Sequence, residues 1–372
     1  MNLSYLSQTP GIGGSIQQSP EDFRVEEITT NGTVLGIDQK IEREGEGKFL
    51  HFILQKTNWT SNAAIKAVAK KLRISFKRFD FAGNKDKVSI STQLCSGFAI
   101  KKEQLLALRV RDIQINGAWY ANDKVRLGQL LGNRFTITVR DSESGTEDKA
   151  NEIYTELDGK IPNYFGEQRF GSTRRNTHWV GEKLVKGRFE DAAMMFLCDS
   201  EGEKHSEASL AREELKRTRD YASALKAFPP HLKLERSMLV HLEKNPNDYI
   251  NAFRKLPRNI LLLFLHAFQS HLFNIILAER IQNNESLDGE GNLIGYETEL
   301  TENEQVLLEK FEIRKEDFNI KSIPEISSKG TKRRWLAELK DFSFVGNTFR
   351  FELPSGSYAT VAMREFLEKE KN

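Results

Sequence analysis

The stretch FAGNKDKVSISTQ, residues 81–93, carries a single carboxylate, Asp86, between Lys85 and Lys87. A glycine precedes the charged residues and small hydroxyl residues follow them, which is typical of a loop. A lysine on each side favours the ionised form of Asp86. An ionised carboxylate with neither a metal motif nor a partner histidine can be a salt-bridge member, a helix cap or a nucleophile. The residues alone favour a structural role over the nucleophile.

The composition around this stretch is that of a soluble globular protein. The chain has 372 residues, enough for two domains, with 38% hydrophobic and 29% charged residues and a mean hydropathy of −0.53. The formal net charge is only +2, so an anion-binding surface must be local. Cys95 and Cys198 provide neither a disulfide framework nor metal-ligand spacing, which fits a reducing cytosol. We expect a cytoplasmic protein without a signal peptide, because the first residues lack a basic and an apolar region.

One apolar run, residues 259–281, has the length of a membrane span, but five polar residues interrupt it: His266, Gln269, Ser270, His271 and Asn274. We therefore expect a buried core helix and no membrane partner. His266 and His271 are five residues apart, which points them to different faces of that helix and disfavours a metal site. The chain contains no P-loop and no dinucleotide-binding glycine motif.

The pattern of apolar residues changes twice along the chain. Strands are expected at 23–28, 49–54 and 134–139, with helices at 60–75 and 146–159, the latter capped by Thr146. The middle is mostly helical, with helix periods at 180–198, 206–226, 231–244 and 258–283. Strands return at 342–354, around a Gly346-Asn347 hairpin turn. The economical interpretation is a helical domain inserted into a mixed domain, because the last strands need a sheet to join.

Two aromatic stretches add candidate binding residues. In NYFGEQRFGSTRRN, 163–176, arginines alternate with aromatic rings, which suits the phosphates and unstacked bases of single-stranded or looped RNA. The alternative is a turn in which Phe165 and Phe170 are core residues, and the composition does not decide between them. In GNRFTI, 132–137, Phe135 is more simply a buried residue than a pocket residue.

Short basic runs recur along the chain and would form an RNA-binding footprint if several met on one surface. They lie at Lys70-Lys71-Arg73, Lys77-Arg78, Lys101-Lys102, Arg109-Arg111 and Lys332-Arg333-Arg334. The sequence does not show whether they converge.

Several blocks resemble one known family. GNKDKVSISTQ resembles the G-x-K-D-x-x-A-x-T-x-Q signature of the TruD family of tRNA pseudouridine synthases. NYFGEQRFG is similar to its second signature and GNRFTI to its third. SPEDFRVEE, FQSHLFN and LPSGSYATVAMRE resemble further family blocks, in family order from residue 19 to 365. Ser89 and Ser91 replace the usual alanine and threonine, and Gln17 and Gln18 stand where many relatives have a lysine.

The resemblance implies an α+β fold of the pseudouridine-synthase type. It predicts a mixed, mainly antiparallel sheet with flanking helices in a discontinuous catalytic domain, residues 1–158 and 333–372. It also predicts a large, mostly helical inserted domain, residues 159–332, with RNA in the cleft between the two. We expect a monomer.

The resemblance further implies a cofactor-independent isomerase of tRNA processing, with no metal, that converts one uridine of tRNA to pseudouridine. The usual substrate position is 13, in the D-arm. Asp86 is the expected catalytic residue, as a nucleophile or as a base at the sugar. The expected substrate-binding residues are Lys85, Asn133, Phe135, Phe165, Gln168 and Arg169. The alternative is an RNA-binding protein of the same fold with broader targets and secondary or no catalysis.

Overall fold

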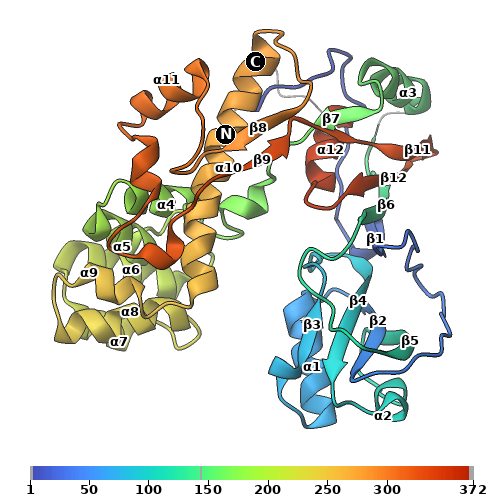
Figure 1. Ribbon diagram of the computed structural model, residues 1–372, viewed down its shortest axis with the longest axis horizontal. Coiled ribbons are helices and arrows are strands. Elements are labelled where there is room, and N and C mark those ends of the chain that lie inside the picture. The colour runs from blue at the N-terminus through green and yellow to red at the C-terminus, as the bar shows by residue number, and fades with distance from the viewer. Residues whose placement is uncertain (1–2, 143–144, 368–372) are drawn as a thin grey trace. The chain divides into compact units, whose positions relative to one another are not determined.

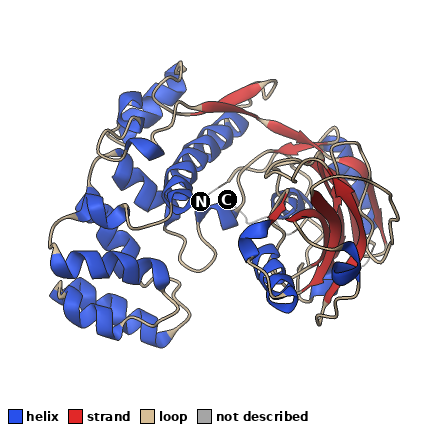
Figure 2. Ribbon diagram, turned by 60° about the horizontal axis from the view of Figure 1, so that its bottom comes forward, coloured by secondary structure: helices blue, strands red, loops and turns tan. Residues whose placement is uncertain are grey.

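The computed structural model describes residues 3–142 and 145–367, which form two compact units. The sheet unit comprises Tyr5–Pro162 and the described part of Ala337–Asn372. The helical unit comprises Asn163–Leu336 and the described part of Met1–Ser4. The chain therefore changes units at 162/163 and 336/337, four residues beyond the expected boundaries at each crossing. Figure 2 shows that strands dominate one unit and helices the other.

The sheet unit is built on a large mixed sheet, with the strand order β11-β12-β6-β1-β4-β2-β5 and a short β3 beside β4. Its strands are β1 (Phe23–Ile28), β2 (Phe49–Thr57), β3 (Phe79–Phe81), β4 (Ile90–Phe98), β5 (Ile113–Ala121), β6 (Gly132–Thr138), β11 (Lys340–Val345) and β12 (Thr348–Pro354). Only β1 and β4 pair in parallel within this sheet; its other described pairings are antiparallel. The predicted mixed, mainly antiparallel sheet is confirmed.

The C-terminal hairpin joins this sheet as expected. β11 and β12 are connected by the two-residue turn Gly346-Asn347, with Gly346 at a φ of +64°. β12 then pairs with β6 over its whole length. The predicted union of the last strands with the N-terminal ones is confirmed, because β6 and β2 belong to the same sheet.

Two apolar clusters fill the sheet unit. Helices α3 (Thr146–Glu156) and α12 (Ala359–Phe366) pack with β1, β6 and β12 in one cluster. Helices α1 (Ser61–Leu72) and α2 (Lys102–Leu106) pack with β2, β4 and β5 in the other (Figure 1). Thr60 caps α1, since its side chain accepts the Ala63 amide. The Thr146 cap is wrong: Gly145 precedes α3, and Thr146 is its first helical residue.

The helical unit contains shorter helices than the sequence suggested. Its helices are α4 (Thr177–Val185), α5 (Phe189–Cys198), α6 (Ser206–Thr218), α7 (Tyr221–Ala227), α8 (Lys233–Lys244), α9 (Tyr249–Phe253), α10 (Arg258–Gln282) and α11 (Glu302–Lys310). The helix expected at 180–198 breaks at Gly187, which has a φ of +69°. The helix expected at 206–226 breaks at Arg219, after which Asp220 caps α7.

Short strands and turns complete the chain. β7 (Lys160–Pro162) pairs with β10 (Leu336–Glu338), and β8 (Glu290–Leu293) pairs with β9 (Thr331–Arg334). Single 3₁₀ turns are η1 (Pro20–Asp22), η2 (Phe76–Arg78), η3 (Glu167–Phe170), η4 (Lys315–Phe318) and η5 (Pro324–Ile326).

Helix α10 is the central helix of the helical unit. By length and composition alone it could cross a membrane, but 72% of its apolar window is buried inside the protein. Its polar side chains have partners there: Gln269 donates to the Ile294 carbonyl at 2.7 Å, and Ser270 to the His266 carbonyl at 2.7 Å. Gly181 of α4 lets the two helices approach closely, because a Cβ there would lie 2.1 Å from the Phe264 carbonyl oxygen. These contacts are those of a core helix.

Candidate active site

The loop that carries Asp86 joins β3 to β4 and is fixed by buried polar side chains. The Ser61 hydroxyl, at the start of α1, accepts the Lys85 amide at 2.9 Å and donates to Gln93 Oε1 at 2.6 Å. The other end of the Gln93 amide donates to the Gly83 carbonyl at 3.1 Å. Ser61 and Gln93 are both fully buried. One helix and one strand thus set the backbone path of the loop.

The small residues after Asp86 have a different place from the one expected. Ser91 and Thr92 lie in β4 rather than in the loop, and both are fully buried, as is Ser89 before the strand. The expected loop therefore ends before Ser91, and the small side chains of Ser91 and Thr92 suit a strand packed on both faces.

Asp86 itself is half-buried, and two side chains bind its backbone carbonyl. Lys56 Nζ donates to this oxygen at 2.7 Å, and the Ser89 hydroxyl donates to it at 2.8 Å. Lys56 comes from β2 and has no exposed surface. The carboxylate-bearing residue therefore has its backbone held from the protein interior.

Lys56 is a buried cation beside the Asp86 carboxylate. Burial lowers its pKa to about 8; the charge of Asp86 raises that pKa, and the charge of Lys85 lowers it further. Desolvation is the largest of these effects. At neutral pH the ammonium remains protonated, so an opposite charge lies next to Asp86 from inside the fold.

Lys85 is also turned inward. Its ammonium forms an ion pair with Glu27 at 2.7 Å, and the two side chains are 4% and 0% exposed. The other Glu27 oxygen accepts the Leu94 amide at 2.9 Å, which ties β1 to β4. Lys87, by contrast, is exposed. The described contacts of Lys85 hold the loop to the sheet, and its contact with substrate stays a prediction.

Asn133 and Phe135 share one face of the sheet with Glu27. In the β1–β6 pairing, Asn133 lies opposite Glu27 and Phe135 opposite Val25, and directly opposed residues of antiparallel strands share a face. Among the described residues, the buried Oδ1 of Asn133 has no hydrogen-bond partner. This acceptor, two residues from Phe135, lacks the hydrogen-bond partner that a buried polar atom usually has.

Phe135 is a core residue in this structure. Its ring is 6% exposed and lies 6.0 Å from the Phe23 ring and 5.6 Å from the Phe351 ring, centroid to centroid. Those contacts leave no open ring face for a stacked base. A role for Phe135 in shaping a base pocket stays a prediction, and stacking would need the ring to move.

The second signature belongs to the helical unit. Phe165 is 8% exposed, and both its amide and its carbonyl bond the Asn274 side chain of α10 at 2.9 Å. Arg169 is half-buried; its Nε donates to the Ser270 hydroxyl at 3.1 Å, and its guanidinium lies 5.6 Å from the Phe165 ring centre. Gln168 is exposed. Phe165 is thus a core residue, while Arg169 and Gln168 reach the surface of this unit.

The arginines that follow differ from one another. Arg174 is only 11% exposed and donates to the carbonyls of Phe196 and Asp199 and to Glu235. These contacts hold its guanidinium inside the helical unit. Arg175 is exposed and pairs with Glu167.

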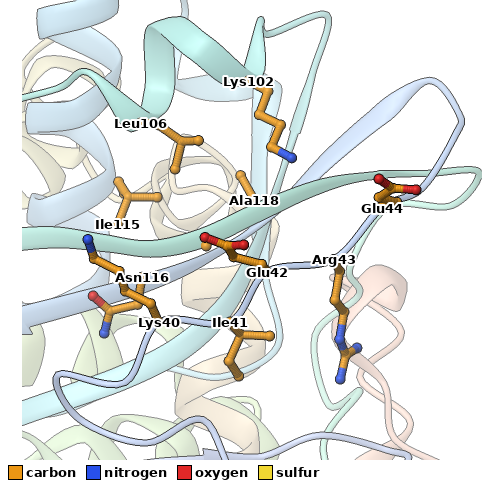
Figure 3. Close-up of a pocket in the computed structure, with 11 residues that line it drawn as sticks. Lys40, Ile41, Glu42, Arg43, Glu44, Lys102, Leu106, Ile115, Asn116 and Ala118 are labelled. Carbon is orange, nitrogen blue, oxygen red and sulfur yellow. The ribbon is translucent and has the colours of Figure 1, made fainter.

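One described cavity lies elsewhere in the sheet unit. It has a volume of about 590 Å³ and is bounded by residues 40–44, by Lys102 and Leu106 of α2, and by 115–118 of β5. Glu42 and Glu44 line it together with Lys40, Arg43 and Lys102 (Figure 3). Its charges are mixed, and none of its lining residues belongs to the Asp86 loop. We assign it no part in the site.

Three residues of the site escaped the sequence interpretation: Glu27, Lys56 and Ser61. Glu27 ends the block PEDFRVEE, which resembles the family, and Ser61 lies at the start of the helix predicted at 60–75. Neither observation predicts a contact with the Asp86 loop. Lys56 continues the apolar run of β2. A lysine at a position expected to be buried is unusual, and this is the sequence signal that could have identified it.

The comparisons with known proteins agree on one family. The family model described as tRNA pseudouridine synthase D (TruD) matches residues 2–294 and 290–366. A probable tRNA pseudouridine synthase D of Methanosarcina acetivorans is 34% identical, over 98% of this chain and 95% of that protein. Its counterpart from Methanopyrus kandleri is 38% identical, over 88% of this chain and 87% of that protein.

A solved structure shows the same likeness. The crystal structure of a putative tRNA pseudouridine synthase D from Methanosarcina mazei superposes with a TM-score of 0.76 at 34% sequence identity. The match covers 99% of this chain and 96% of that one.

Proposed function

The chain belongs to the TruD family of tRNA pseudouridine synthases, and we propose that it isomerises the uridine at position 13 of the tRNA D-arm with Asp86 as the catalytic carboxylate. The reaction breaks the bond between N1 of uracil and C1′ of the ribose, rotates the base and joins C5 to C1′. C5 loses a proton and N1 gains one, so no atom is added or lost overall. One carboxylate at the junction of sugar and base can serve this chemistry, as a nucleophile or as a base at the sugar.

The observation that carries this proposal is the way in which the protein holds Asp86. Lys56 and Ser89 bind its carbonyl, and Ser61 binds the amide before it, so the residue is positioned before any substrate arrives. Catalytic groups gain from such fixed positioning, because no reorganisation is then needed in the transition state. A salt-bridge carboxylate at a surface would need no such buried support.

The target base must leave its stack to reach a carboxylate in a protein loop. Extruded bases are bound through the donors and acceptors on their pairing edge. The unmatched Oδ1 of Asn133 fits this need, since uracil presents an N3–H donor on that edge. We propose that Asn133 accepts from the uracil and that Phe135 forms part of the wall behind it.

The experiment uses tRNA labelled with tritium at C5 of its uridines, because forming the C5–C1′ bond releases that hydrogen. The wild-type protein should release it without added cofactor. Asp86→Asn should release none in a long single-turnover incubation, while keeping its melting temperature and its tRNA affinity. A partly exposed carboxylate with only a structural role would instead cost roughly 1 kcal/mol or less of stability and leave the chemistry intact.

Asp80→Asn is the matched control. Asp80 is a partly exposed carboxylate of β3, 3.2 Å from Lys124, and lies six residues before Asp86. The control should retain full activity. Substantial product from Asp86→Asn would refute the catalytic assignment. Mapping pseudouridine in the product tests the position separately: product in a tRNA that lacks uridine at position 13 would refute the site but not the reaction.

A further inference from the structure

Two basic runs that are far apart in the sequence meet on one surface of the sheet unit. Lys70 and Lys71 of α1, the Arg73 after it, and Arg109 in the connection from α2 to β5 line one groove of about 470 Å³. Ala67 and Val110 complete its lining. We call it the α1 groove (α1 and α2 are labelled in Figure 1). Residues 36 to 39 positions apart thus supply charge to the same place.

The positive charges of the α1 groove are not balanced by nearby carboxylates. All four basic residues are exposed, and within the described part of the chain none of them forms an ion pair with a carboxylate. No acidic residue lines the groove in the part of the chain that the structure describes; Asp112, nearby in the sequence, pairs with Arg111 at 3.4 Å. The whole chain has 55 basic and 53 acidic residues, almost equal numbers. A groove lined by four basic residues and no described acidic one is therefore more positive than the chain as a whole. The cavity beside β5, with Glu42 and Glu44 in its wall, shows the ordinary balance.

Local structure explains part of this arrangement only. Lys70 and Lys71 lie in the last turn of α1, where cations favour the helix dipole. Arg109 donates to the carbonyls of Leu106 and Leu108 near the end of α2. Neither reason requires the two helix ends to face one groove, where like charges repel one another. Arg73 adds a further charge at a left-handed position, φ +56°, where glycine is the usual residue.

We propose that the α1 groove binds the phosphate backbone of the tRNA substrate, an inference that rests on the proposed function. Several unpaired cations in one groove match a run of phosphates, and such contacts position an RNA without reading its sequence. Lysine and arginine side chains from two elements can contact successive phosphates of one strand. The groove residues lie outside the Asp86 loop, so they bind the substrate without taking part in the reaction.

The test measures the affinity of the full chain for a full-length tRNA transcript over a series of KCl concentrations. Lys70→Ala/Lys71→Ala removes two groove charges. Arg73 stays because it occupies the strained helix end, and Arg109 because it caps α2. The control, Lys40→Ala/Lys102→Ala, removes the same net charge from the charge-balanced cavity. The groove variant should reduce the slope of log affinity against log salt by about 2, one for each phosphate contact. The control should leave the slope near the wild-type value.

Four further outcomes separate the possibilities. Single-turnover pseudouridine formation at low tRNA concentration should fall in the groove variant together with its tRNA affinity, because the groove binds the substrate. Equal slopes in the groove variant and the control would overturn the proposal, as would groove-dependent binding to phosphatidylserine vesicles with an unchanged tRNA affinity. If the wild-type protein forms no pseudouridine but the slopes still differ, the groove assignment stands and the proposed function fails.

Discussion

Lys56 is a cation that the fold keeps away from solvent, within the influence of the charge of Asp86. Burial lowers its pKa from the usual 10.5 to about 8, so folding disfavours its protonated form. Below pH 8 both the folded and the unfolded chain carry the charge, and the full cost of burying it is present. Between about pH 8 and 10.5 the folded chain has released the proton and the unfolded chain has not. The burial of Lys56 therefore destabilises the protein less and less as the pH rises through that window.

The prediction concerns Lys56→Met, which removes the charge and keeps a flexible apolar side chain. From pH 8 to 10.5 the free energy of unfolding of the wild type should rise relative to that of the variant, by about 3 kcal/mol. Urea unfolding at a series of pH values measures the difference, and titrations common to both proteins cancel. Parallel curves would show that Lys56 is not the buried cation that the structure describes.

The Lys85–Glu27 pair is a second buried charge arrangement at the same loop. Lys85→Met leaves Glu27 buried without its partner, and breaking such a pair should cost about 3–5 kcal/mol. Glu27→Gln should cost a similar amount, although its amide oxygen still accepts from Leu94. The double variant removes both charges, so it should be much more stable than the sum of the single losses predicts. Additive losses in urea unfolding would contradict the pairing.

At the scale of elements, α10 fixes the second signature through one side chain. Asn274 satisfies both the amide and the carbonyl of Phe165, deep in the helical unit. Asn274→Ala should leave both groups unsatisfied, at a cost of about 1–3 kcal/mol for each. Gln282→Ala, at the exposed end of the same helix, is the control and should change stability by less than about 0.5 kcal/mol. A loss in Asn274→Ala no larger than in the control would refute this role of Asn274.

The elements that could be predicted from the sequence are those whose pattern is local. Helix α1 has a cap and an apolar face at helical spacing, and the β11–β12 hairpin has a Gly-Asn turn between alternating strands. Strand β4 was not predicted, because it is buried on both faces and its first half fills them with the polar Ser91, Thr92 and Gln93. The breaks at Gly187 and Arg219 were missed because the helix period continues across them.

At the scale of the whole molecule, the candidate site was predictable in part. Asp86, Asn133 and Phe135 are found from the blocks that resemble the family, and the structure places Asn133 opposite Glu27. Lys56 and Glu27 were not predicted because their roles depend on partners from other strands. Partners that meet only in the folded sheet leave no spacing signal in the chain. The convergence of the basic runs in the α1 groove was unpredictable for the same reason.

The helical unit has the contacts of an independently folding insertion. The chain enters it at Asn163 and leaves it at Leu336, and these two ends are tied together inside the unit. The Asn163 amide donates to the Trp335 carbonyl at 2.8 Å, and its side chain donates to the Arg334 carbonyl at 3.0 Å. Adjacent ends are what an inserted domain needs to fold without strain on its host. Ser4 belongs to this unit although it lies outside residues 163–336. Its carbonyl accepts a hydrogen bond from Tyr164, and its hydroxyl donates one to the Ala278 carbonyl.

We therefore predict that residues 163–336 fold alone. The isolated fragment should show a helical far-ultraviolet circular dichroism spectrum and one cooperative thermal transition, because α10 and the helices around it form its core without the sheet. Losing the two hydrogen bonds of Ser4, each worth about 1 kcal/mol, should lower its melting temperature by about 4–8 °C. The same fragment with Asn163→Ala, which unties the ends, should melt earlier. A fragment with little helix or a broad, non-cooperative transition would show that the helical unit depends on the sheet unit to fold.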